Sequence, residues 1–191
     1  MKEFELPSYS EELLKGQKPK YMLISCADSR VPKGELLTGF KYLPGEVFTI
    51  SNAGNCYLLN LETFYYGVLH LSVEKVIVCG HNNCGMMKAV INGRDENPHI
   101  QEAINTIRET VFGGTLPTND VDELAKENVH RQIEMMMKDD AIKSAMNVGT
   151  LKKLLGLYYD FSSGIPELYL INVNGQTMEE KIKWDELRDK L

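Results

Sequence analysis

The sequence predicts an α/β protein: a mainly parallel central β-sheet, flanked by helices, with an antiparallel edge strand. Three observations predict this class. Short apolar runs end abruptly at turn residues, stretches with helical periodicity separate them, and a late pair of apolar runs is joined by a tight turn. Short apolar runs bounded by turn residues are typical of buried parallel strands. Their alternation with helical segments favours a sheet covered by helices.

The first third of the chain begins with a polar segment rich in helix formers. We expect residues 1–20 to form an N-terminal helical arm that docks on another surface. Apolar runs at 21–25 and 47–50 follow, and each ends at a turn-rich segment, so both are predicted strands. Residues 59–71 carry their apolar side chains on one broad face, which predicts an amphipathic helix.

The middle of the chain contains the clearest strand, at residues 75–80, and a predicted helix at 86–91. The section from 98 to 146 is expected to be largely helical, with an interruption at Gly113-Gly114 and Pro117. Because no repeat, low-complexity tract or linker divides the chain, we predict one domain over residues 1–191.

Two apolar runs close the predicted sheet. Residues 153–160 turn through Ser162-Ser163-Gly164 into residues 167–172, which is the spacing of a β-hairpin. This hairpin would add the antiparallel strand at the sheet edge. We expect a polar helix after it, at the C-terminal end.

Composition narrows the class of function. The chain has 191 residues, 43% of them apolar, and a net charge of −6, which argues against binding to nucleic acid. It contains no apolar run of the roughly 18 residues that a membrane span needs, and no apolar leader at its start. We therefore expect a cytoplasmic protein with neither nucleic acid nor membrane as a partner. Four cysteines in a reducing compartment favour metal binding, catalysis or simple burial over disulfides.

Soft metal-binding side chains follow two of the predicted strands. Cys26 lies at the end of the first, and His81 and Cys84 follow the clearest strand. Functional groups of open α/β sheets collect outside the carboxyl ends of the strands. Two thiolates and one imidazole are donors that Zn²⁺ prefers, and three protein ligands leave a fourth position open for chemistry. Taken alone, His81-x-x-Cys84 also fits a buried cysteine beside a turn histidine.

A carboxylate and a guanidinium follow Cys26 closely. Alternation along an extended segment would send Cys26, Asp28 and Arg30 to one side. Arg30 could then hold Asp28 ionised and oriented through a bidentate pair. Asp28 could accept a hydrogen bond from a zinc-bound hydroxide or bind the metal itself. An ordinary surface ion pair is the other interpretation of this fragment.

Two segments resemble a known family. Ser25-Cys26-Ala27-Asp28-Ser29-Arg30-Val31 and Cys79-Gly80-His81-Asn82-Asn83-Cys84-Gly85-Met86 are similar to the signatures of the β-carbonic anhydrases. The segment Asn52-Ala53-Gly54-Asn55 resembles the family's Asn-Ala-Gly loop, and residues 156–164 resemble its late strand and turn. The similarity extends over nearly the whole chain.

This resemblance implies a zinc enzyme that interconverts CO2 and bicarbonate, with one Zn²⁺ per subunit. Cys26, His81 and Cys84 match the family's fixed metal ligands, and Asp28 with Arg30 matches its catalytic dyad. In the family, the aspartate can also take the fourth zinc position in a closed, inactive form. Family members are usually dimers or assemblies of dimers, so we expect self-association.

Two other functions stay open at this point. The same metal site would serve a hydrolase of CS2 or COS, because pocket shape selects the substrate. A non-catalytic zinc-binding module would keep the same fold. For proton transfer, the histidines outside the site are candidates by residue type alone: His70, His99 and His130.

Overall fold

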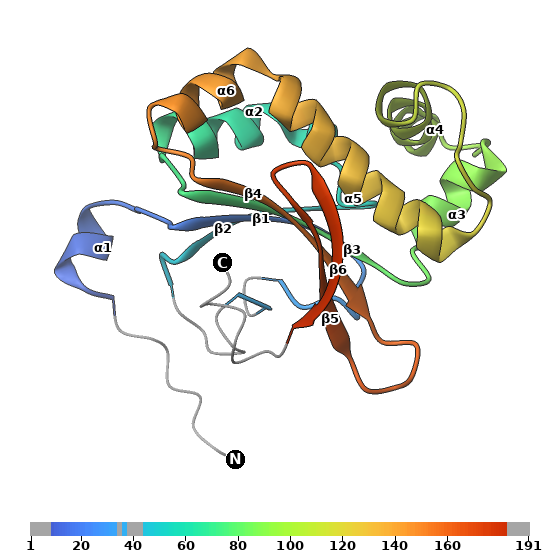
Figure 1. The fold of residues 1–191 in the computed structure, drawn as a ribbon, viewed down its shortest axis with the longest axis horizontal. Coiled ribbons are helices and arrows are strands. Elements are labelled where there is room, and N and C mark those ends of the chain that lie inside the picture. Colours follow the sequence, from blue (N-terminus) through green and yellow to red (C-terminus); the bar gives the residue numbers. More distant parts are fainter. Residues whose placement is uncertain (1–8, 34–35, 38–43, 183–191) are drawn as a thin grey trace.

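A six-stranded sheet forms the centre of the molecule (Figure 1). The computed structural model describes residues 9–33, 36–37 and 44–182. The strand order is β2-β1-β3-β4-β5-β6. Neighbours from β2 to β4 run parallel, whereas the pairs β4–β5 and β5–β6 are antiparallel. The α/β class and the mainly parallel sheet are thus confirmed. The strands are β1 (Tyr21–Cys26), β2 (Val47–Asn52), β3 (Lys75–His81), β4 (Lys153–Asp160), β5 (Glu167–Val173) and β6 (Gln176–Ile182).

Helices connect β2 to β3 and fill the long section between β3 and β4. The predicted helix after β2 and the largely helical section from 98 to 146 are confirmed, although π-helical turns interrupt both. Of the predicted N-terminal arm, residues 1–8 lie outside the described part, and one short helix follows. The helices are α1 (Glu11–Lys15), the 3₁₀ helix η2 (Tyr57–Asn60), α2 (Leu61–Tyr65), the π-helix η3 (Tyr66–His70), α3 (Gly85–Asn92), α4 (Pro98–Asn105), the π-helix η4 (Thr106–Val111), α5 (Val121–Lys138) and α6 (Asp140–Asn147).

The end of the described chain differs from the prediction. The hairpin from β4 to β5 forms as expected, but a further strand that was not predicted, β6, follows it and is the antiparallel edge strand. A polar helix was predicted for the C-terminal end, of which residues 183–191 lie outside the described part. The cause of the additional strand is a second hairpin with a two-residue loop, Asn174-Gly175, between the paired Val173 and Gln176. Both loop residues have positive φ angles, 50° and 87°. Asn-Gly favours this conformation, whose twist matches that of the flanking strands.

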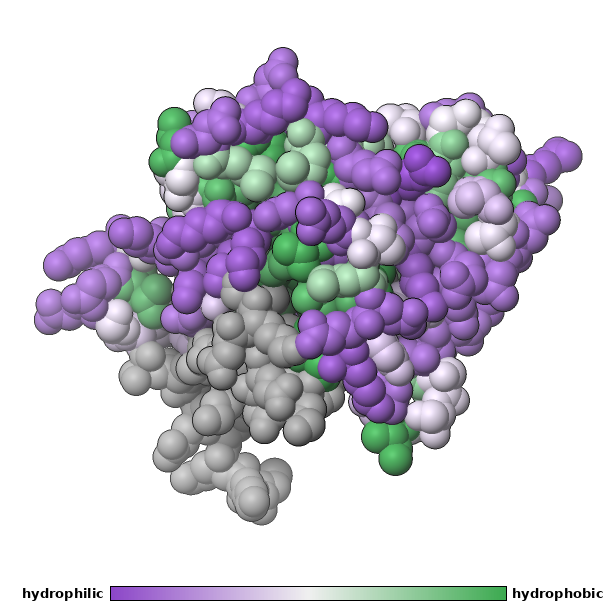
Figure 2. Space-filling model, viewed as in Figure 1, coloured by the Kyte–Doolittle hydropathy of each residue, from purple (hydrophilic) through white to green (hydrophobic). Residues whose placement is uncertain are grey.

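Both faces of the sheet are buried at its central strands, β1, β3 and β4. In β1, Met22 and Ile24 belong to the core that includes side chains of α2, α3, α5 and α6, whereas Tyr21 and Leu23 belong to a second core on the opposite face. Because side chains alternate along a strand, a run buried at every position needs cover on both sides. In the view of Figure 2, hydrophobic groups at the surface are small and separated by hydrophilic ones. Among the described helices, none has the length and apolar composition for crossing a membrane.

Helix α5 lies close against the strands at two glycines. A Cβ atom at Gly156 of β4 would lie 2.7 Å from Val129 Cγ1, and one at Gly80 of β3 would lie 3.0 Å from the Ala125 carbonyl oxygen. Because these two residues have no side chain, α5 can pack closely on β3 and β4. This helix also holds the loop after β2, because Asn128 Nδ2 donates to the Gly54 carbonyl oxygen at 3.0 Å.

Asp139 joins α6 to α2 and yields a first prediction. Its carboxylate accepts from the backbone N–H groups of Ala141 and Ile142 and from the Tyr65 hydroxyl at 2.6 Å. Burial opposes ionisation, but these donors outweigh it and lower the pKa of Asp139. We expect Asp139→Ala to lower the free energy of unfolding at neutral pH by about 1–2 kcal/mol, as the loss of a helix N-cap does.

The pH dependence of this difference follows from the lowered pKa. A carboxyl with a lowered pKa stabilises the fold above its unfolded pKa, about 3.9, and this stabilisation is lost as the pH falls through the folded pKa. The difference between wild type and Asp139→Ala, measured by urea unfolding, should therefore shrink below about pH 4. Asp140→Ala is the matched control, because the neighbouring Asp140 side chain is exposed and pairs only with Lys143 among the described residues. An equal loss of stability in both variants would contradict the prediction.

Candidate metal centre

Two neighbouring parallel strands bring the predicted donors to one edge of the sheet. Cys26 is the last residue of β1, and His81 is the last residue of β3. Cys84 follows after a tight turn and is the N-cap residue of α3. The strands pair in register from Tyr21 and Lys75 onward, so their carboxyl ends lie side by side. This is the position at which α/β sheets present functional groups.

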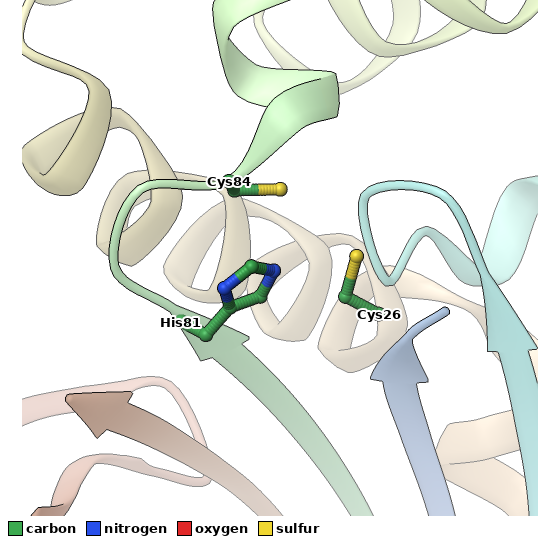
Figure 3. A group of neighbouring side chains, drawn as sticks. All are labelled: Cys26, His81 and Cys84. Carbon is green, nitrogen blue, oxygen red and sulfur yellow. The ribbon is translucent and has the colours of Figure 1, made fainter. Parts of the chain in front are cut away.

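The three side chains converge on one point. Figure 3 shows Cys26, His81 and Cys84 pointing toward one another from β1, β3 and the start of α3. Their ligand atoms all lie within 4.8 Å of one another. The residues are 4%, 0% and 1% exposed, respectively. Three donor atoms at this separation can reach a single ion.

His81 is oriented by its own backbone. Its Nδ1 lies 2.8 Å from the Asn82 carbonyl oxygen, and because a carbonyl only accepts, Nδ1 must carry the proton. The other ring nitrogen, Nε2, is buried and has no hydrogen-bond partner among the described residues. An orphaned buried nitrogen with a free lone pair is costly unless something binds it. Nε2 is therefore the atom that would coordinate a metal.

The two thiols lie close enough to share a proton. A hydrogen bond from Cys84 lowers the pKa of Cys26, against the opposing effect of burial. The hydrogen bond with Cys26, together with burial, raises the pKa of Cys84. The Gly54 backbone N–H also donates to Cys26 Sγ, at 3.5 Å, which favours the thiolate. One thiolate forms readily, and a cation would favour deprotonation of both.

The donor set fits Zn²⁺. Two sulfur atoms and one imidazole nitrogen match its preference for soft and borderline ligands, and the orphaned Nε2 of His81 supplies the third lone pair. Among the described residues, this group of donors contains three members, and Asp28 is not one of them. A fourth coordination position would thus remain for another ligand.

Asp28 and Arg30 form the bidentate pair that the sequence suggested. Arg30 Nε donates to Asp28 Oδ1 at 2.9 Å, and Nη2 donates to Oδ2 at 2.7 Å. The Arg30 hydrogen bonds outweigh the effect of burial and hold the pKa of Asp28 well below its ordinary range, so the carboxylate is ionised. Arg30 Nη2 also lies 3.4 Å from the Asn83 carbonyl oxygen, which connects the pair to the turn between His81 and Cys84.

The prediction that strand alternation places Cys26, Asp28 and Arg30 on one side was wrong. Strand β1 ends at Cys26, so strand alternation does not align Asp28 and Arg30 with it. A turn does so instead: Arg30 N donates to Asp28 Oδ1 at 3.0 Å, and Val31 N donates to the Asp28 carbonyl oxygen at 3.1 Å. An aspartate that accepts from the backbone two residues ahead forms a local turn.

The hydrogen bonds of three residues that support the candidate site were not predicted from the sequence. Lys33 Nζ donates to the carbonyl oxygens of Cys26 and Asp28, at 2.5 and 3.0 Å. Asp122 of α5 accepts from Asn83 N at 2.6 Å, where Asn83 has a φ of 54°. Gly54, which the family resemblance included without a role, has a φ of 86° and aims its N–H at Cys26. Only Gly54 carried a sequence signal, because glycine tolerates positive φ.

The remaining candidates lie elsewhere. Of the histidines proposed for proton transfer, His70 contacts Tyr66 in η3. His130 lies 3.0 Å from Asn172, and burial lowers its pKa. His99 is an exposed residue in the first turn of α4. None of the three belongs to the donor group found among the described residues. The two other cysteines, Cys56 and Cys79, are buried thiols outside that group, and burial raises the pKa of each.

Comparisons with known proteins show the family to which the chain belongs. A family model described as carbonic anhydrase matches residues 21–165. A carbonic anhydrase of Emericella nidulans is 39% identical over 93 residues, which are 47% of this chain and 40% of that relative. The chain thus matches less than half of the length of that curated protein.

Solved structures cover more of the chain. A tetrameric β-carbonic anhydrase of Sordaria macrospora has a TM-score of 0.65 and 25% identity, and the match covers 82% of this chain and 83% of that one. The Coccomyxa β-carbonic anhydrase, solved in complex with acetazolamide, has a TM-score of 0.68 and 26% identity, with 90% and 77% covered. The fold of this chain therefore occurs in solved β-carbonic anhydrases.

Proposed function

Because the chain belongs to the carbonic anhydrase family, we propose that it catalyses the reversible hydration of CO2 to bicarbonate and a proton. The convergence of Cys26, His81 and Cys84 at one buried point is the observation that carries this proposal. A structural zinc site is normally closed by four protein ligands, whereas three suit catalysis. The assignment of these residues as ligands of one Zn²⁺ per subunit is part of the proposal.

Bound zinc would supply Lewis acidity, which makes a nucleophile available from water near neutral pH. The protein's own part begins with its donors. His81 would use Nε2, because its Nδ1 is committed to the Asn82 carbonyl. The Gly54 N–H donates a hydrogen bond to Cys26 Sγ. This bond would reduce the electron density that the thiolate donates to a bound metal.

Asp28 would orient the attacking water. Its Oδ1 accepts from both Arg30 N and Arg30 Nε, so both lone pairs of this oxygen are in use. Its Oδ2 accepts only from Arg30 Nη2 among the described residues and keeps one lone pair. An ionised carboxylate accepts hydrogen bonds but cannot donate them. It would therefore fix the direction of an O–H bond of the attacking water, and with it the direction of the oxygen lone pair that attacks CO2. The closed form, with Asp28 as a conditional fourth ligand, remains a prediction.

Removal of the metal tests the proposed function. We expect protein purified under reducing conditions to contain about one zinc per chain and to accelerate CO2 hydration. Dialysis against a chelator should abolish this acceleration, and stoichiometric Zn²⁺ should restore it, because the three donors need a cation to act together. Metal content by atomic emission and stopped-flow CO2 hydration measure both quantities. Metal-loaded protein that leaves the CO2 reaction at its uncatalysed rate would refute the proposal.

The alternatives are tested in the same assay. Rates with CO2, COS and CS2 side by side decide which linear substrate the site prefers. A zinc-binding module without catalysis would load metal fully and act on none of the three substrates.

We further propose that the chain is a single domain that self-associates as a dimer or a larger assembly. Exposed apolar side chains on α2 and η3, including Leu61, Tyr66 and Leu69, offer a surface for this. The Sordaria macrospora relative is tetrameric. The described cysteines are all free thiols, which fits a reducing compartment, so we propose the cytoplasm as the location.

A further inference from the structure

The Phe161 ring lies against both parts of the site. Phe161 follows directly after β4, which ends at Asp160. Its ring centroid is 4.6 Å from Arg30 Cζ, a cation–π contact. The same ring stacks with the His81 imidazole, with centroids 6.0 Å apart and planes inclined by 21°. One side chain therefore contacts the partner of Asp28 and a candidate metal ligand.

The backbone around Phe161 fixes the ring at this place. The β3–β4 ladder ends at the pair His81 and Tyr159. Asn82 extends it by one step: its N–H donates to the Tyr159 carbonyl oxygen at 3.3 Å, and its side-chain Oδ1 accepts from Phe161 N at 3.0 Å. Asn82 is only 5% exposed, so these bonds are shielded from water. The segment that carries His81 thus also positions Phe161.

Arg30 needs such support. Its side chain is 46% exposed, whereas that of Asp28 is 17% exposed. A long exposed side chain loses rotamer freedom when it is held in one geometry, and for this reason exposed ion pairs are weak. An aromatic face under the guanidinium favours one orientation and leaves the N–H groups free to donate in the plane of the guanidinium.

We propose that Phe161 is a positioning residue, which holds Arg30 in the orientation that fixes the Asp28 carboxylate beside the metal centre. This inference rests on the proposed function for its catalytic consequence, but the hold on Arg30 is a property of the protein itself. An aliphatic side chain of similar volume would fill the space without the attraction to a cation. Phe161→Leu isolates this difference, and Phe161→Tyr and Phe161→Trp keep the aromatic face.

Nuclear magnetic resonance of the metal-free protein tests the contact directly. We expect the Arg30 Nε–H signal to carry the ring-current shift of Phe161 and to lose it in Phe161→Leu. Phe161→Tyr should keep a shift of the same sign. Phe48→Leu is the matched control, because Phe48 is also partly buried but contacts Tyr66 on another element. An Arg30 signal that is the same in wild type and in Phe161→Leu would overturn the inference.

Kinetics then test the consequence. We expect Phe161→Leu to lower kcat about three- to tenfold, with zinc content and KM little changed, as the loss of a cation–π contact allows. Phe161→Tyr and Phe161→Trp should stay within about twofold of wild type. In an Arg30→Ala background, Phe161→Leu should have no further effect, because the residue acts through Arg30.

The outcomes separate this inference from the proposed function. Wild-type protein that does not hydrate CO2 would refute the proposed function, while the Arg30 signal would still decide whether Phe161 holds the guanidinium. Active wild type with a Phe161→Leu loss that persists unchanged in Arg30→Ala would overturn the positioning role. The positioning role would be established if Phe161→Leu lowers kcat only in protein that retains Arg30, and if Phe161→Tyr and Phe161→Trp keep the wild-type rate.

Discussion

Cys84→Ser should greatly weaken the binding of zinc and lower the rate of CO2 hydration with it. The binding free energy of zinc at thiolate-rich sites is about 10–16 kcal/mol, so each of three or four ligands contributes roughly 3–4 kcal/mol. The loss of one thiolate should therefore weaken zinc affinity by about a hundred- to a thousandfold. Serine keeps the size of the side chain and the start of α3 but stays neutral. Competition with a chromophoric chelator measures the affinity, and stopped-flow measures the rate.

Cys79→Ala is the matched control for this experiment. Cys79 is a fully buried cysteine of β3, but it belongs to the second core, on the other face of the sheet from the core that includes Cys26 and Cys84. Its substitution should leave zinc affinity unchanged, although it leaves a small cavity. A Cys84→Ser protein that binds zinc as tightly as wild type would exclude Cys84 as a ligand.

Asp28→Asn is expected to have the second largest effect, on the rate alone. The amide is nearly the same size, but it places a donor where the carboxylate offers only acceptors, and it can no longer form the charged pair with Arg30. Positioned proton-accepting groups contribute about a hundred- to ten-thousandfold to catalysis, so kcat/KM should fall by at least about a hundredfold. Zinc content should stay at the wild-type level, since Asp28 is outside the donor group.

Glu74→Gln provides the comparison for Asp28→Asn. Glu74 forms an ion pair with Lys152 at 2.9 Å, next to the starts of β3 and β4 and so at the opposite ends of these strands from the candidate site. This variant loses a carboxylate of the same kind and should retain full activity. If Asp28→Asn were as active as Glu74→Gln, Asp28 would have no part in the reaction. If wild type and Asp28→Asn were equally inert with zinc bound, the non-catalytic module would be the better description.

The sequence predicted the donors because strand ends leave a clear pattern. The predicted strands at 21–25 and 75–80 are apolar runs that stop at polar turns, and parallel strands place such stops side by side. The chemistry of two cysteines and a histidine then suggested the metal. These features depend on local periodicity and residue type, which a single sequence contains.

Other parts of the site depend on contacts that leave no local pattern. Lys33 reaches back to the Cys26 carbonyl, and Asp122 reaches from α5 to the turn at Asn83. Neither residue type nor spacing distinguishes these side chains from surface charges. The edge strand β6 is a different case, because Asn174-Gly175 is a strong hairpin signal. Residues 176–182 are mostly polar, a composition that an exposed edge strand tolerates.

The pairing of β1 with β3 has a thermodynamic consequence. Cys26 and His81 are far apart along the chain and meet only when these two strands lie side by side. An ion held by both would bind the native ensemble and hardly bind the denatured one, so mass action couples occupancy to folding. At a free concentration one hundred times its dissociation constant, such an ion would add about 2.7 kcal/mol to the native state. The resistance of this protein to denaturation would then vary with the supply of metal around it.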